Sequence, residues 1–221
     1  TASADVVDTP YGETSGPIEY GFLDGVGVYF LQRHGRAKAI PPHLINYRAN
    51  VWALQSLGVT DVVAINAVGG ISAQMRPGAL VIANQLIDYT WGREHTFDIG
   101  GDTGLMHIDF TQPYDDTLRD AVKRAADNAG VSYQAVATLA VTQGPRLESA
   151  AEIKRLAGDG CDVVGMTGMP EASLAKELGL AYASICMVVN AAAGLSDVPI
   201  TLAMIQATLE REAVVVNRLL A

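Results

Sequence analysis

The order of elements along the chain predicts an α/β fold, with a single domain in which a central mixed β-sheet is flanked by helices on both faces. Short β-branched and aromatic runs alternate with amphipathic helical patterns, and no long linker divides the chain. The 221 residues are 49% hydrophobic and 18% charged, which suffices for one sizeable core. We therefore expect residues 1–221 to form one domain.

The first half of the chain predicts three strands and one helix. A β-branched and aromatic run at 27–31 predicts a buried strand that ends in a polar cluster. Apolar residues then recur at helical spacing from Pro41 to a stop at Gly58. The apolar run 61–68 predicts a central strand that is buried on both faces and broken by the glycine pair behind it. A further strand is expected at 79–83.

An irregular stretch at 88–113 precedes a second alternation of helices and strands. The apolar side chains of residues 116–128 fall on one side of a helical wheel and predict an amphipathic helix. Thr201 is expected to cap a last helix that runs toward Leu220. Between these two helices, the patterns predict strands at 135–141, 162–164 and 181–189 and helices at 149–156 and 171–178.

Composition and charge exclude several classes of function. The formal net charge is −9 and the 15 basic residues are scattered, whereas a nucleic-acid-binding protein needs clustered cations. No apolar run approaches the ~20 residues of a membrane helix, and no secretory signal opens the chain. Cys161 and Cys186 lie in apolar surroundings, which favours reduced, buried thiols and a cytoplasmic location. We expect neither a nucleic acid nor a membrane as a partner.

Polar or glycine residues follow four of the predicted strands, where ligands of open α/β sheets collect. Arg33, His34 and Arg36 would form a cationic spot suited to a phosphate dianion, or else a solvated turn. The second spot is residues 66–70 (Asn-Ala-Val-Gly-Gly). Its glycine pair would let a ligand approach backbone N–H groups, although such pairs are also common in turns.

The other two spots lie in the second half of the chain. In residues 164–171, Thr167 ends a strand and Pro170 opens a helix whose amide dipoles point back at the loop. An ordinary capped helix start is the alternative. Asn190 follows a long apolar strand, where a buried amide must hydrogen-bond to protein or to ligand.

Other kinds of site are not supported by the motifs. The four histidines show no paired i,i+4 spacing, and no Cys-x-x-Cys motif is present, so no metal site is predicted. A Gly-x-Ser-x-Gly elbow and a Walker loop are also missing, and the glycine-rich segments are too short for a dinucleotide-binding motif.

Taken together and in this order, the segments resemble the purine nucleoside phosphorylase and methylthioadenosine phosphorylase family. The similarity runs from about Arg33 to the last helix, and the implied fold is nucleoside phosphorylase-like. Within the family, the chain is most similar to the bacterial branch that acts on S-methyl-5′-thioinosine. The most specific parts are residues 33–35 (RHG), 46–54 (NYRANVWAL), 66–70 (NAVGG), 144–148 (GPRLE) and 165–171 (GMTGMPE).

The resemblance implies reversible phosphorolysis, in which phosphate attacks the anomeric carbon of a nucleoside and a purine base departs. Inorganic phosphate is then a co-substrate, and no cofactor is implied. By position, Met166 would line the ribose, and Asn190 would share catalysis with Arg33, His34 and Thr167. The positions implied for the phosphate are Arg33, His34, Asn66, Ala67 and Thr167.

The resemblance also indicates which base is used. Adenine-using relatives carry aspartates where this chain has Asn190 and Ala192, and a serine where it has Glu148. An Asn can donate to O6 and accept from a protonated N7, and a Glu can accept from N1–H, which fits a 6-oxopurine. The expected reaction converts S-methyl-5′-thioinosine and phosphate to hypoxanthine and S-methyl-5-thioribose 1-phosphate. Further contacts with the nucleoside are expected from Gly69, Leu147, Ala191 and Ala192.

The 5′ group of the nucleoside is expected near the start of the last helix. Leu202 and Ile205 would favour a methylthio group over a hydroxyl, although both are equally compatible with a core role. His107 lies where relatives approach the 5′ region. The family also implies a homotrimer in which a neighbouring subunit closes the pocket.

Two departures from the family leave alternatives open. Relatives begin with a strand and a Gly-Gly-[Ser/Thr]-Gly phosphate loop; nothing before Arg33 matches it, so we expect this segment to be missing before Thr1. Lys38 also stands where many relatives carry a histidine. The alternatives are a general inosine and guanosine phosphorylase, a methylthioadenosine phosphorylase, a nucleosidase, and a non-catalytic nucleoside-binding protein.

Overall fold

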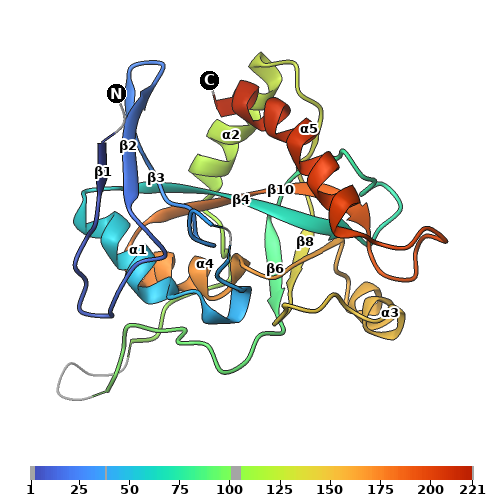
Figure 1. Cartoon of the computed structure of the whole chain (residues 1–221), viewed down its shortest axis with the longest axis horizontal. Helices are drawn as coiled ribbons and strands as arrows, with labels where there is room; N and C mark the ends of the chain where they lie inside the picture. Colours follow the sequence, from blue (N-terminus) through green and yellow to red (C-terminus); the bar gives the residue numbers. More distant parts are fainter. Residues whose placement is uncertain (1–2, 38, 101–105, 221) are drawn as a thin grey trace.

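Two long parallel strands, β4 (Asp61–Gly70) and β10 (Ala181–Ala191), run side by side through the centre of the computed structural model (Figure 1). They belong to a seven-stranded mixed sheet with the strand order β6–β8–β9–β4–β10–β5–β7. The remaining strands of this sheet are β5 (Leu80–Ile82), β6 (Gln85–Asp88), β7 (Tyr133–Gln134), β8 (Thr138–Val141) and β9 (Val163–Gly165). The predicted mixed sheet is therefore confirmed.

The structure describes residues 3–37, 39–100 and 106–220, so Lys38 lies outside the described residues. Over these ranges, no helix combines the length and the apolar character that crossing a membrane requires.

Helices cover both faces of the central sheet, as the sequence predicts. Ile185 and Met187 of β10 pack into a core cluster with residues of α2 and α5, whereas Cys186 and Val188 pack with residues of α1 and α4 on the other face. Because both faces of β10 are buried, its sequence is apolar almost throughout. The helices are α1 (Tyr47–Ser56), α2 (Asp116–Asn128), α3 (Ala150–Gly158), α4 (Gly168–Glu177) and α5 (Leu202–Leu220).

Side-chain caps decide where the helices begin. The predicted helix start near Pro41 is wrong, because Asn46 caps α1 by accepting a hydrogen bond from the backbone N–H of Ala49 at 3.1 Å. The residues before it form a short 3₁₀ helix, Pro42–Leu44. Thr201 caps α5 as predicted, since its hydroxyl accepts from the backbone N–H of Met204 at 3.3 Å.

The glycine pair at the end of β4 does not break the strand, contrary to the sequence prediction. Gly69 and Gly70 pair with β9 on one side and with β10 on the other. A Cβ on Gly70 would lie 1.7 Å from the carbonyl oxygen of Met75. Glycine is therefore needed here for a close backbone approach and not for a turn.

The strand predicted at 27–31 is exposed and lies outside the central sheet, so its prediction as a buried strand is wrong. It is β3 (Val26–Phe30), which pairs antiparallel with β2 (Ile18–Leu23), and β2 pairs with β1 (Ser3–Asp5). Asp24 and Gly25 join β2 to β3, both with positive φ, as a two-residue hairpin turn requires. A run of apolar residues alone does not distinguish a solvent-facing hairpin from a core strand.

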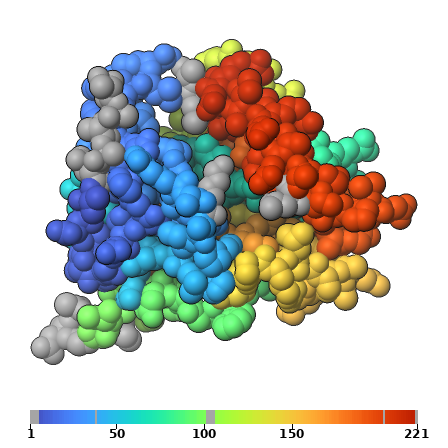
Figure 2. Space-filling view, in the orientation of Figure 1, coloured from blue at the N-terminus to red at the C-terminus, as the bar shows by residue number. Residues whose placement is uncertain are grey.

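Between the N-terminal sheet and the central sheet the surface is concave. Figure 2 shows this hollow between the blue N-terminal segment and the red α5, with the teal of the central sheet at its floor. Among the described residues, β10 pairs with one edge of β4 along residues 61–68. The other edge of β4 pairs only at Gly69 and Gly70, where its partner is β9.

Candidate functional site

Three segments that are distant in the sequence meet around the guanidinium of Arg33. Asn66 lies on β4, and Thr167 lies in the turn between β9 and α4. Nη1 of Arg33 donates to Oδ1 of Asn66 at 2.6 Å and to Oγ1 of Thr167 at 3.0 Å. The Thr167 hydroxyl donates to the same Asn66 oxygen at 2.9 Å. The structure therefore brings together three of the residues that the sequence assigns to phosphate.

A buried carboxylate, which sequence reasoning did not single out, balances the charge of Arg33. Oε1 of Glu171 lies 3.0 Å from Nη2 of Arg33 and accepts a hydrogen bond from the hydroxyl of Tyr182 at 2.8 Å. The side chains of Arg33 and Glu171 are only 15% and 9% exposed. We call Arg33, Asn66, Thr167 and Glu171 the anion cluster. The signal that could have found Glu171 was its place in the motif at residues 165–171.

Burial and charge act in opposite directions on Arg33. Desolvation works against its charged form, whereas the Glu171 carboxylate and the nearby phenols of Tyr182 and Tyr47 favour it, and the pKa of Arg33 lies above its ordinary value. Burial, together with the neighbouring carboxylate, raises the pKa of Tyr182. Arg33 is thus a fixed cation and Tyr182 a neutral hydrogen-bond donor.

The anion cluster keeps hydrogen-bond donors for a further group. Both Nη1 hydrogens of Arg33 are used by Asn66 and Thr167, and Nη2 faces the Glu171 carboxylate, whereas Nε makes no hydrogen bond with any residue in the described ranges. Thr167 occupies the N-cap position of α4, where the first backbone N–H groups of a helix lack partners within the helix. A guanidinium and free N–H groups are the donors that a phosphate dianion requires.

The other residues assigned to phosphate lie around this cluster. Nδ1 of His34 lies 2.8 Å from the carbonyl oxygen of Ile40 and therefore donates to it, which leaves Nε2 as the second polar atom of the ring. Ala67 is exposed on β4 directly after Asn66. Arg36 is not part of the site, because its exposed guanidinium pairs with Glu19 at 2.9 Å.

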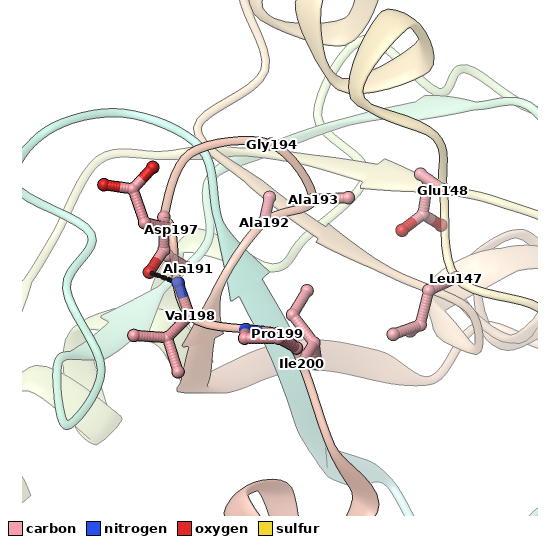
Figure 3. Close-up of a pocket in the computed structure, with 11 residues that line it drawn as sticks. Leu147, Glu148, Ala191, Ala192, Ala193, Gly194, Asp197, Val198, Pro199 and Ile200 are labelled. Carbon is pink, nitrogen blue, oxygen red and sulfur yellow. Dashed lines mark hydrogen bonds between the residues drawn. The ribbon is translucent and has the colours of Figure 1, made fainter.

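A cavity of about 310 Å³ lies at the carboxyl end of β10 (Figure 3). Leu147 and Glu148 form one side, and the loop 193–200 forms the other. Ala191 and Ala192 also line it. Oε1 of Glu148 accepts a hydrogen bond from the hydroxyl of Thr142 at 2.6 Å, which fixes this carboxylate at the wall. We call this space the Glu148 cavity.

Asn190 and Gly69 lie next to the Glu148 cavity but are not among its lining residues. The side-chain amide of Asn190 donates to the carbonyl oxygen of Ala191 at 2.7 Å. A Cβ on Gly69 would lie 3.5 Å from both Nδ2 of Asn190 and Cα of Ala192. A Cβ at Gly69 would therefore be in ordinary van der Waals contact with the Asn190 amide, and its tightest contact would be with Cγ1 of Val164 at 3.2 Å.

Met166 connects the anion cluster to the cavity. It precedes Thr167 directly, and its sulfur would lie 2.5 Å from a Cβ placed on Gly144. Gly144 has a φ of +61°, a conformation that favours glycine. Its lack of a side chain also leaves room for the sulfur of Met166. Met166 therefore lies between the segment that carries Thr167 and the segment that leads to Glu148.

Of the described residues assigned to the 5′ group, neither Ile205 nor His107 lines the Glu148 cavity. Ile205 packs against the core cluster of α2, α5 and β10, as its core interpretation predicts. Leu202 begins α5, and its side chain lies outside the described part of the structure. His107 is exposed in the irregular part of the chain between β6 and α2.

Cys161 and Cys186 are free and buried, as predicted. Burial raises the pKa of the Cys186 thiol to about 11, which makes it unreactive. In the ranges that the structure describes, no three His, Cys, Asp or Glu side chains are grouped so that they could hold a metal ion.

Comparison with known proteins identifies the family. The whole chain, residues 1–221, matches the model of the phosphorylase superfamily. The chain belongs to this superfamily. A probable S-methyl-5′-thioinosine phosphorylase of Xylella fastidiosa is 54% identical to this chain over 193 residues. The match covers 86% of this chain and 81% of that protein. The 6-oxopurine nucleoside phosphorylase of Pyrococcus furiosus is 46% identical to this chain over 202 residues. The match covers 89% of this chain and 76% of that protein.

Solved structures show the same fold for this phosphorylase-superfamily chain. A methylthioadenosine phosphorylase from Schistosoma mansoni, in complex with adenine, superposes with a TM-score of 0.95 at 33% sequence identity. The match covers 99% of this chain and 82% of that one. The family resemblance and the fold class predicted from the sequence are both confirmed.

Replacing Glu171 by glutamine is expected to lower the free energy of unfolding by about 3–5 kcal/mol, because the buried guanidinium of Arg33 loses its counter-charge. Tyr182→Phe removes one hydrogen bond to the same carboxylate and should cost only about 1 kcal/mol. Urea denaturation of both variants measures the difference. A loss for Glu171→Gln no larger than that for Tyr182→Phe would show that the ion pair does not hold the cluster together.

Proposed function

We propose that the chain catalyses the reversible phosphorolysis of a 6-oxopurine nucleoside, with S-methyl-5′-thioinosine as its best substrate. The products are hypoxanthine and S-methyl-5-thioribose 1-phosphate. One observation carries the proposal: Met166, which precedes Thr167 of the anion cluster, packs against Gly144 in the segment that leads to the fixed carboxylate of the Glu148 cavity. The names of the relatives at 54% and 46% identity support the same reaction.

Arg33, Thr167, Asn66, Ala67 and His34 hold the phosphate in this proposal. An oxygen of the phosphate forms a bond to C1′ of the ribose as the bond from C1′ to N9 breaks. The electron pair of the broken bond moves onto the purine, which takes up a proton from solvent at N7. Fixed donors around the phosphate orient the nucleophile and stabilise the charge that separates in the transition state.

The base occupies the Glu148 cavity. Its N1–H donates to the Glu148 carboxylate, which the Thr142 hydroxyl already orients. The amide of Asn190 turns from the carbonyl of Ala191 to the base, where it donates to O6 and accepts from N7–H. Leu147 and Ala192 contribute apolar contact to the purine ring. An adenine would offer an amino group where the Asn190 amide requires an acceptor.

A homotrimer completes the site in this proposal. His107 is exposed and does not line the Glu148 cavity, so in this proposal a neighbouring copy supplies the His107 that contacts the 5′ group. Release of a free purine base places the reaction in purine salvage, and two buried free thiols agree with a reducing cytoplasmic environment.

A general inosine and guanosine phosphorylase is the second candidate, and the name of the Pyrococcus furiosus relative favours it. Both candidates use the anion cluster and the Glu148 cavity in the same way. They differ only in the 5′ group, because a methylthio group needs apolar contacts and a hydroxyl needs a hydrogen-bonding partner.

Release of hypoxanthine from S-methyl-5′-thioinosine is expected to require inorganic phosphate and to be faster than release from inosine. S-methyl-5′-thioadenosine should be a poor substrate. An ultraviolet assay of base release, with and without phosphate, measures the rate for each of the three nucleosides. Turnover that ignores phosphate would indicate a nucleosidase, and binding without turnover a non-catalytic protein; equal rates on the adenine nucleoside would contradict the assignment of the base.

Asn190→Asp is expected to shift the preference toward 6-aminopurines, because a carboxylate accepts from the amino group and no longer donates to O6. One mismatched buried hydrogen bond costs about 1–3 kcal/mol, so the ratio of kcat/KM for 6-oxo over 6-amino nucleosides should fall by about 5–150-fold. Asn128→Asp, at the exposed end of α2, makes the same chemical change as a control. An unchanged ratio in Asn190→Asp would exclude contact between this residue and the base.

A further inference from the structure

Arg93 lies in the irregular segment after β6, and every nitrogen of its guanidinium donates to an oxygen of a segment around the site. Nη1 donates to the backbone carbonyls of Met166 at 2.9 Å and Met169 at 2.5 Å, and to the hydroxyl of Tyr47 at 3.3 Å. Nη2 donates to the carbonyls of Thr142 at 3.3 Å and Gln143 at 2.9 Å, and Nε to Oε1 of Gln143 at 3.2 Å. Most of these partners are backbone oxygens.

The two segments that Arg93 joins carry opposite halves of the proposed site. The carbonyls of Met166 and Met169 lie on either side of Thr167, which belongs to the anion cluster. Thr142 holds the carboxylate of Glu148 at the wall of the cavity. Arg93 thus bonds to the backbone on both sides of the gap that a nucleoside and a phosphate would fill.

The chemistry of these contacts requires an arginine. Both segments leave the sheet at the ends of β8 and β9, where carbonyl groups lose their ladder partners and need other donors. A planar fork can serve several of them at once, whereas a lysine is a point charge on a flexible stem. The Tyr47 ring, 5.5 Å from the guanidinium carbon, supports one face of the fork. Within the described ranges, no carboxylate forms a salt bridge with Arg93.

We infer that Arg93 is a positioning residue for the proposed phosphorolysis: it sets the separation and orientation of the anion cluster and the Glu148 cavity without touching the substrate. The inference rests on the proposed function. Each half of the site retains its own ligands without Arg93, since the ion pair of Arg33 and the hydrogen bond of Glu148 do not involve it. Only their alignment depends on this side chain.

The test compares Arg93→Lys and Arg93→Ala with the wild type. We expect kcat to fall by about 100-fold in both variants, because misplacement of the reacting groups by about 1 Å has this effect. The affinities for phosphate alone and for hypoxanthine alone, measured by calorimetry, should stay close to the wild type with full stoichiometry. Guanidinium ion added to Arg93→Ala should restore part of kcat.

Arg119→Lys is the matched control. Arg119 is buried and also donates to backbone carbonyls, those of Ala83 and Ala135, but it lies away from the site on α2. Its replacement should lower the melting temperature and leave kcat unchanged. A purely structural role for Arg93 predicts the same behaviour as Arg119: lower stability, a binding stoichiometry that falls together with activity, and no rescue by guanidinium.

The wild-type protein separates this inference from the proposed function. If the wild type shows phosphate-dependent base release and Arg93→Lys retains its kcat, the positioning role is overturned and the proposed function stands. If the wild type neither releases nor binds hypoxanthine, the proposed function fails, and the role of Arg93 fails with it. The positioning role and the proposed function are both supported if the Arg93 variants have a reduced kcat, unchanged affinities for phosphate and for hypoxanthine, and, in Arg93→Ala, rescue by guanidinium.

Discussion

The ion pair between Arg33 and Glu171 places a guanidinium and a carboxylate 3.0 Å apart in a largely buried position beside β4 and β10. Neither charge is tolerable there alone, because an unpaired ion in such an environment is strongly destabilising. The pair therefore constrains everything that surrounds it. Asn66 on β4 and Tyr182 on β10 hydrogen-bond to its two ends, so the parallel pairing of these strands determines the geometry of the cluster.

The packing of the sheet extends this constraint to the neighbouring segments. Nδ2 of Asn66 donates to the hydroxyl of Ser184, a fully buried residue of β10, and this bond fixes which way the Asn66 oxygen points. Thr167 reaches the same oxygen because β9 ends beside β4, where Gly69 and Gly70 allow a close approach. The geometry of the proposed anion site thus follows from the pairing of β4 with β10 and β9.

Much of this arrangement could be predicted from the sequence, because residues that follow apolar strands collect at one edge of a sheet. Arg33, Asn66 and Thr167 are predicted in this way, although β3 before Arg33 lies outside the central sheet and Asn66 lies within β4 and not after it. Glu171 is not, although it belongs to the motif at residues 165–171, because its pairing with Arg33 depends on how distant segments pack together. The direction of the Asn190 amide and the role of Arg93 are also properties of side-chain contacts between distant segments. The strand β3 is predicted correctly, but its exposure is not, because its apolar run is typical of a core strand.

A crystal structure of the protein with inorganic phosphate and hypoxanthine tests the central claim most directly. The account predicts a phosphate oxygen within about 3 Å of Nε of Arg33 and another near Thr167, with the purine in the Glu148 cavity and the Asn190 amide turned toward it. Phosphate bound elsewhere, with the donors of Arg33 facing no ligand, would contradict it.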